Sequence, residues 1–139
     1  MTGPGEISTR RKRLLFMDDE EMLRSVVSRM LEIMGYDVMT AIDGEEAVRL
    51  YIEAAESGSG FDAVILDLSV HTGMGGRDAI AKLIEYDPDV IALVSSGFVG
   101  DPVLQNYSDF GFRGVIPKPY TSDELRDGLT RVLVPKMAS

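Results

Sequence analysis

Four short, strongly apolar runs each lead directly into a polar residue, and this pattern limits the possible folds more than any other feature of the chain. The runs are residues 14–17, 63–66, 90–94 and 115–117, and they lead into Asp18, Asp67, Ser95 and Lys118. Apolar runs of this length, bounded by turn residues, are typical of buried strands in a parallel sheet. Because ligands bind at the carboxyl ends of the strands in open α/β sheets, we expect the four polar side chains to converge at one edge.

Helical patterns separate these runs. Apolar residues recur every three to four positions through residues 20–34, which predicts a helix with one buried face. The same reasoning predicts a strand over residues 37–40 and helices over residues 44–56, 76–86, 102–110 and 122–133. Asp43 with Glu46, and Thr121 with Glu124, have the spacing of helix-capping pairs. Five strands that alternate with five helices predict βαβ units, and therefore a parallel sheet covered on both faces.

Length and composition exclude several classes of protein. The 139 residues suit a single domain over residues 13–134, with a disordered leader at 1–12 and a tail at 135–139. The absence of cysteine excludes disulfides and thiolate metal sites. A net charge of −9 disfavours binding to nucleic acid and to anionic membranes. No apolar stretch resembles a membrane span or a secretory signal, so we predict a cytoplasmic protein without membrane contact.

The acidic residues predict a metal site. The Asp18-Asp19 pair alone is equally compatible with a helix cap, but Asp67 also follows an apolar run. Two carboxylates about 4 Å apart repel each other by roughly 4 kcal/mol at an effective dielectric constant of 20. A divalent cation relieves this repulsion, and Mg²⁺ (or Mn²⁺) prefers such hard oxygen ligands.

The same groups can receive a phosphoryl group. A carboxylate such as Asp67 can attack phosphorus and form an acyl phosphate. The metal would neutralise one side of the phosphoryl oxygens and Lys118 the other, while Ser95 donates a hydrogen bond to a third oxygen. Each residue alone has an ordinary structural explanation, Ser95 as a strand-end cap and Lys118 as a surface lysine. Their coincidence at successive strand ends favours a site.

Four segments carry a family resemblance. They are Met17-Asp18-Asp19-Glu20, Leu66-Asp67-Leu68, Val94-Ser95-Ser96-Gly97 and Lys118-Pro119-Tyr120. Together they resemble the receiver domain of two-component response regulators. Residues 67–76, 95–98 and 101–103 look most like receivers of hybrid sensor histidine kinases. The resemblance implies a flavodoxin-like, doubly wound sheet with strand order 2-1-3-4-5.

The resemblance also implies roles for individual residues. Asp67 accepts phosphate from the phosphohistidine of a histidine kinase or histidine phosphotransfer domain, which switches the partner-binding face. Asp18, Asp19, Asp67 and the backbone carbonyl of Ser69 bind the metal. Ser95 is the switch hydroxyl, Lys118 pairs with the phosphoryl group, and the Lys118-Pro119 peptide bond is cis. Such a domain is not an enzyme in the usual sense, because it catalyses only its own phosphorylation and slow dephosphorylation. Whether phosphorylation drives formation of a homodimer is left open by the sequence.

Two positions depart from the family pattern, and one alternative function remains open. His71 stands where receivers usually have proline, and Val115 stands where many have an aromatic switch residue. The alternative is a receiver-like interaction module that no longer transfers phosphate. A haloacid-dehalogenase phosphatase is disfavoured because Ser69 occupies the position of its general acid. A flavin carrier is disfavoured because the acidic loop after the first strand would repel a phosphate.

Overall fold

Five parallel strands form a single sheet in the order β2-β1-β3-β4-β5, which confirms the predicted fold class. The computed structural model describes residues 11–70, 73–97 and 100–133. The strands are β1 (Arg13–Met17), β2 (Asp37–Ala41), β3 (Ala63–Asp67), β4 (Ala92–Ser96) and β5 (Gly114–Pro117). The predictions for residues 1–10 of the leader, for the tail and for His71 concern residues that lie outside this description. Residues 11 and 12, predicted as the end of the disordered leader, are described, and both contact Asp37.

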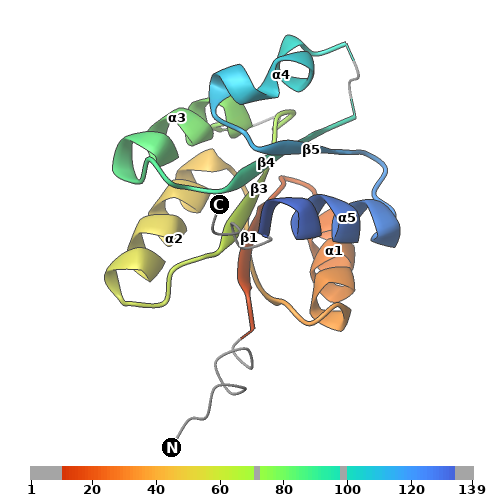
Figure 1. Cartoon of the computed structure of the whole chain (residues 1–139), viewed down its shortest axis with the longest axis horizontal. Helices are drawn as coiled ribbons and strands as arrows, with labels where there is room; N and C mark the ends of the chain where they lie inside the picture. Colours follow the sequence, from red (N-terminus) through yellow and green to blue (C-terminus); the bar gives the residue numbers. More distant parts are fainter. Residues whose placement is uncertain (1–10, 71–72, 98–99, 134–139) are drawn as a thin grey trace, which may run out of the picture.

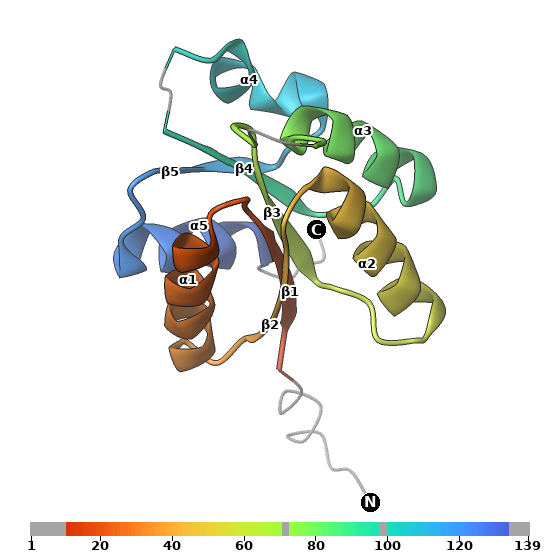
Figure 2. The same cartoon turned by 180° about the vertical axis from the view of Figure 1, so that it is seen from behind.

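Helices cover both faces of the sheet (Figures 1 and 2). They are α1 (Glu21–Ile33), α2 (Gly44–Glu56), α3 (Gly76–Tyr86), α4 (Pro102–Gln105) and α5 (Ser122–Leu133), with a 3-10 turn η2 (Tyr107–Phe110) after α4. In both views α1 and α5 lie on one face, and α2 and α3 lie on the other with α4. Among the helices of the described residues, none is both long and apolar enough to cross a membrane.

Successive strand residues point alternately into two separate cores, one on each face of the sheet. Because both faces are buried, the strands are continuous apolar runs in the sequence. On the α1/α5 side the core contains Leu14, Phe16, Val27, Leu31, Ala63, Ile65, Leu93, Ile116, Leu125 and Leu129. On the other side it contains Leu15, Met17, Val64, Leu66, Ala92 and Val94, packed against residues of α2, α3 and α4 that include Tyr51, Ile80, Leu83 and Val103. All five residues of β3 are buried, so the central strand holds Asp67 on a rigid support.

Two elements differ from the sequence prediction by more than one residue at an end. The strand β4 begins two residues later than predicted, because the backbone N–H of Val90 bonds the carbonyl of Asp87 in a turn (3.1 Å). The helix predicted over residues 102–110 is divided into α4 and η2. It breaks at Asn106, whose backbone (φ −123°, ψ 40°) is not helical.

Both predicted capping pairs form. The Asp43 side chain accepts a hydrogen bond from the backbone N–H of Glu46 (2.9 Å), and Glu46 Oε1 accepts one from the N–H of Ile42 (2.8 Å). Thr121 Oγ1 likewise accepts from the N–H of Glu124 (3.1 Å). These bonds satisfy backbone donors that a helix start leaves free.

Asp43→Ala should lower the free energy of unfolding by about 1 kcal/mol, because the first turn of α2 loses its cap. For a domain of this size that corresponds to a fall in Tm of about 3–5 °C. Thermal unfolding followed by circular dichroism measures it. Asp127→Ala, which removes an exposed carboxylate inside α5, is the matched control. Equal Tm values for the two variants would contradict the assigned cap.

Candidate functional site

The predicted polar side chains gather at the carboxyl edge of the sheet. Asp18 directly follows β1 and Lys118 directly follows β5, as expected. Asp67 and Ser95, however, lie inside β3 and β4 rather than after them. The reason is that the ladder continues: Asp67 is the register partner of Ser95, and the N–H of Leu68 bonds the carbonyl of Ser95 (2.9 Å).

Three carboxylates form a cluster at this edge. Asp18, Asp19 and Asp67 each offer one oxygen, and these oxygens all lie within 4.8 Å of one another. The Asp18 and Asp67 side chains are almost fully buried, at 0% and 1% exposed. Burial, together with the charge of Asp18, raises the pKa of Asp67, although Lys118 and the N–H of Ser69 oppose this rise. The charged form of Asp67 is therefore held in an unfavourable environment.

Lys118 supplies the compensating positive charge. Its Nζ lies 2.8 Å from Asp18 Oδ2 and 3.3 Å from Asp67 Oδ1, and its side chain is 19% exposed. Burial lowers the pKa of Lys118, but the hydrogen bonds and charges of the two aspartates outweigh it and raise the pKa overall. The ammonium group therefore remains protonated between the ends of β1, β3 and β5. The Lys118-Pro119 peptide bond is cis, as the resemblance implies.

Four contacts fix Asp18. Its Oδ1 accepts a hydrogen bond from the N–H of Glu20 (2.9 Å), in a turn just before α1 and not as a cap of the helix itself. Its Oδ2 faces Lys118. Arg24 Nη1 donates to the Asp18 carbonyl (2.8 Å), and the Asp18 N–H donates to the carbonyl of Ala41 (3.1 Å).

The cluster fits a hard divalent cation. Asp67 Oδ2 is buried and has no hydrogen-bond partner among the described residues, and an orphaned carboxylate oxygen of this kind is costly. Asp18 and Asp67 share the ammonium group of Lys118, and Asp19 adds a third carboxylate to the cluster. Asp18, Asp19 and Asp67 are the side chains that could hold Mg²⁺, whose preferred ligands are such oxygens. Ser69 contributes its N–H to Asp67 Oδ1 (3.2 Å), and the metal-binding role of its carbonyl stays a prediction.

A close helix–strand contact keeps the end of β3 in place. A Cβ atom built on Gly76, the first residue of α3, would lie 2.9 Å from the carbonyl oxygen of Asp67. Any larger residue there would push α3 away from the strand that carries the acidic side chain. Gly76 therefore helps to keep the end of β3 in place.

Sequence reasoning missed one residue of the site, Tyr120. Ser95 Oγ is hydrogen-bonded to Tyr120 Oη, and the tyrosine ring packs edge-to-face against Phe16, with ring centroids 6.0 Å apart. The Lys118-Pro119-Tyr120 segment was recognised as a motif, but its sequence carries no sign that the tyrosine hydroxyl would meet the serine.

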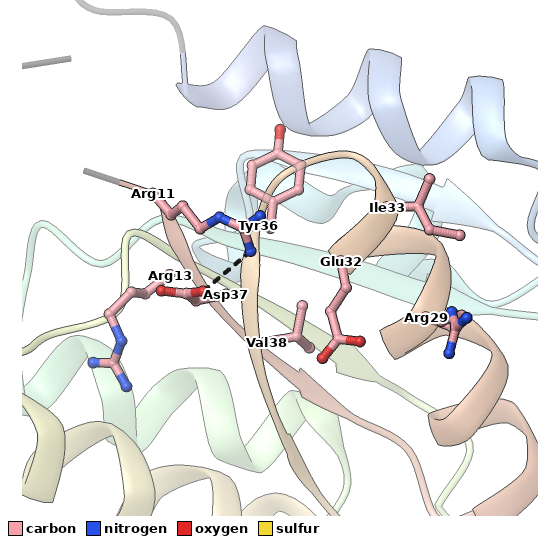
Figure 3. Close-up of a pocket in the computed structure, with 8 residues that line it drawn as sticks. All are labelled: Arg11, Arg13, Arg29, Glu32, Ile33, Tyr36, Asp37 and Val38. Atoms are coloured by element: carbon pink, nitrogen blue, oxygen red, sulfur yellow. Dashed lines mark ion pairs between the residues drawn. The ribbon is translucent and has the colours of Figure 1, made fainter. Parts of the chain in front are cut away.

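A hollow of about 630 Å³ lies at the start of β1 and β2, at the opposite end of these strands from the acidic cluster (Figure 3). Three arginines line it, which suggests an anion site. Arg11, however, pairs with Asp37 (3.5 Å), and the side chains of Arg13 and Arg29 point away from each other. The charges do not converge, so the hollow does not qualify as a binding site.

Comparison with known proteins identifies the family. The response regulator receiver domain family matches residues 14–130, which is most of the chain. The chain belongs to this family. The match spans all four segments that carry the resemblance, and therefore the whole acidic edge.

Individual relatives are diverse. The chain is 31% identical over 125 residues to the probable transcriptional regulator ycf27 of Guillardia theta, covering 88% of this chain and 46% of that protein. It is 29% identical over 126 residues to ethylene receptor 2 of Oryza sativa subsp. japonica, covering 87% of this chain and 16% of the receptor. The receiver therefore spans less than half of either relative. Because the two differ in kind, they do not single out the hybrid kinases.

A solved structure supports the fold. The receiver superposes with a TM-score of 0.81 on a chain of a CheX–CheY complex with BeF3 and Mg²⁺ from Borrelia burgdorferi. The identity is 22%, and the match covers 89% of this chain and 90% of that chain.

Asp67→Asn should stabilise the receiver in the absence of divalent metal, because it removes a buried charge whose pKa is raised. We expect a gain on the order of 1 kcal/mol, since Lys118 offsets part of the carboxylate repulsion. The raised pKa means that the folded state holds the proton more tightly than the unfolded state. The advantage of the variant is therefore fully present above the folded pKa of Asp67 and shrinks as the pH falls through it.

Thermal unfolding between neutral and acidic pH measures this difference. Asp127→Asn, at an exposed position, is the control and should leave Tm unchanged. Addition of Mg²⁺ should raise the Tm of the wild type more than that of Asp67→Asn. A variant that is less stable than the wild type at neutral pH without metal would contradict the assigned electrostatics.

Proposed function

We propose that this receiver accepts a phosphoryl group on Asp67 from the phosphohistidine of a histidine kinase or histidine phosphotransfer domain. The observation that carries the proposal is the state of the Asp67 carboxylate. Oδ2 is buried and has no hydrogen-bond partner in the described part of the chain, whereas Oδ1 is held by Ser69 and Lys118. One oxygen is thus fixed by the protein, and the other is left for an incoming electrophile.

The proposed reaction forms an acyl phosphate. A carboxylate oxygen of Asp67 attacks phosphorus, the P–N bond of the phosphohistidine breaks, and the imidazole leaves and takes up a proton. Bound Mg²⁺ would neutralise phosphoryl oxygens and would itself be held by Asp18, Asp19, Asp67 and the carbonyl of Ser69. Lys118 neutralises charge from the other side, and Ser95 donates a hydrogen bond to a phosphoryl oxygen. The receiver catalyses only this transfer and the slow hydrolysis of its product.

Intact-mass spectrometry after incubation with acetyl phosphate and Mg²⁺ tests the proposal. We expect one added phosphoryl group on the wild type and on the Asp127→Asn control. Asp67→Asn should remain unlabelled, and so should the wild type without Mg²⁺.

The alternative, a receiver-like module that does not transfer phosphate, predicts a different outcome. A wild type that folds and binds Mg²⁺, yet gains mass neither from acetyl phosphate nor from a phosphorylated kinase, would support that module and overturn the proposal. The buried Asp67 Oδ2, which has no hydrogen-bond partner among the described residues, favours transfer. A module that does not transfer phosphate would have no use for two buried carboxylates, Asp18 and Asp67, that repel each other.

An apolar hollow beside the acidic edge fits the approach of a phosphoryl donor. It measures about 470 Å³, and its walls are Leu23, Val26, Val27 and Met30 of α1 and residues 118–120 of the loop after β5. Val26 is 50% exposed. The hollow adjoins Lys118, so a domain that docks there is next to the acceptor. We propose that the histidine-bearing domain of the donor occupies it.

Val26→Asp should weaken phosphotransfer from a protein donor and spare labelling by acetyl phosphate, which needs no docking surface. The donor in the test is a phosphorylated histidine phosphotransfer domain that transfers to the wild type. We expect at least a ten-fold slower transfer, because a charge would replace a buried apolar contact. Ile33→Asp is the matched control, since Ile33 is exposed on the same helix and does not line this hollow. Equal slowing by both variants would rule out the assigned surface.

Four wider proposals rest on the sequence and on the family resemblance. Residues 67–76 support an origin in a hybrid sensor histidine kinase. The composition supports a cytoplasmic location without membrane contact, and the net charge of −9 argues against nucleic acid as a partner of this domain. Phosphorylation-dependent homodimerisation would be visible as a change in molar mass by light scattering after labelling.

A further inference from the structure

The hydroxyl of Ser95 is hydrogen-bonded to a residue outside the acidic cluster. In this structure Ser95 Oγ is hydrogen-bonded to Tyr120 Oη, and Ser95 is fully buried. Among the described residues, Ser95 and Tyr120 have no other hydrogen bond from these hydroxyls in the structure. In the unphosphorylated receiver, each hydroxyl is therefore the hydrogen-bond partner of the other.

The position of Tyr120 is fixed by packing rather than by the hydrogen bond. Its ring lies edge-to-face on Phe16 of β1, at an interplanar angle of 74°, and packs against the core on the α1/α5 side. Burial raises the pKa of Tyr120, so the phenol stays neutral and its oxygen can accept a hydrogen bond from Ser95. Val115, where many receivers have an aromatic residue, packs on the opposite side of the sheet. Tyr120 is thus the aromatic residue that contacts this serine.

We propose that Tyr120 is a positioning residue that holds Ser95 in a resting orientation and competes with a phosphoryl group on Asp67 for its hydroxyl. In the resting orientation Ser95 donates its single hydroxyl proton to Tyr120 Oη, so it must give up this bond before it can donate to a phosphoryl oxygen. The bond to Tyr120 therefore weakens the phosphorylated state relative to the resting state. This inference rests on the proposed phosphoacceptor function, because the competitor is the phosphoryl group on Asp67.

Beryllofluoride, which mimics a phosphoryl group on a carboxylate, tests the competition in the presence of Mg²⁺. Calorimetric titration should show that Tyr120→Phe binds beryllofluoride about five-fold more tightly than the wild type, the scale of one neutral hydrogen bond. Tyr36→Phe, which removes a phenol at the far end of the sheet, should match the wild type. Affinity for Mg²⁺ alone should be the same in all three proteins, which shows that the acidic cluster is intact.

A double-mutant cycle separates positioning from a general structural effect. In a Ser95→Ala background, Tyr120→Phe should no longer change the affinity for beryllofluoride. In a Ser95→Thr background, which keeps the hydroxyl, the five-fold effect should return. An unchanged affinity in Tyr120→Phe, or an equal change in the Ser95→Ala background, would overturn the inference.

A measurement on the unliganded protein distinguishes failure of this inference from failure of the proposed function. The proton in the Ser95–Tyr120 hydrogen bond should give an NMR signal protected from exchange in the wild type, and this signal should be absent from Ser95→Ala. If that signal is present but the wild type takes up neither beryllofluoride nor a phosphoryl group, the proposed function fails while the contact stands. Absence of the protected signal overturns the contact itself.

Discussion

The ion pairs of Lys118 are the interaction on which the acidic edge depends. One ammonium group, from the end of β5, lies against Asp18 at the end of β1 and Asp67 on β3. These strands are not neighbours of β5 in the sheet, where β4 separates β5 from β3. Lys118 therefore reaches across the carboxyl edge and offsets repulsion that the rigid sheet would otherwise impose on two buried carboxylates. Removal of this charge would leave both of them uncompensated in a low-dielectric environment.

Different parts of the domain provide stability and form the candidate site. The apolar residues of β1, β3 and β4 fill the two cores, and the capped helices add local stability. At the edge, the raised pKa of Asp67 and its unpaired Oδ2 show that stability has not been maximised. An unfavourable resting carboxylate is useful if a cation and a phosphoryl group later relieve it. This is the pattern expected of a functional site held in place by a stable scaffold.

The sequence predicted those features that depend on pattern alone. A sheet covered on both faces requires apolar runs without alternation, and residues 14–17 and 63–66 have that character. The caps at Asp43 and Thr121 follow from local backbone chemistry, so they too were predictable. The late start of β4 and the break at Asn106 could not be predicted, because they depend on which of several competing backbone hydrogen bonds forms in the folded protein. The bond between Ser95 and Tyr120 joins residues that are distant in sequence, and no spacing rule connects them.

That bond also changes the expected route by which the switch hydroxyl is coupled to the rest of the domain. With Val115 in place of an aromatic residue, coupling through β5 itself lacks its usual side chain, and Val115 packs on the α2/α3/α4 side. Ser95 instead contacts a ring that packs on the α1/α5 side, and that ring also lines the hollow against α1. If Ser95 moves as proposed, that movement acts first on the wall of a surface hollow next to Lys118. Tyr120 is the residue that joins the two, because it is bonded to Ser95 and also lines the hollow against α1.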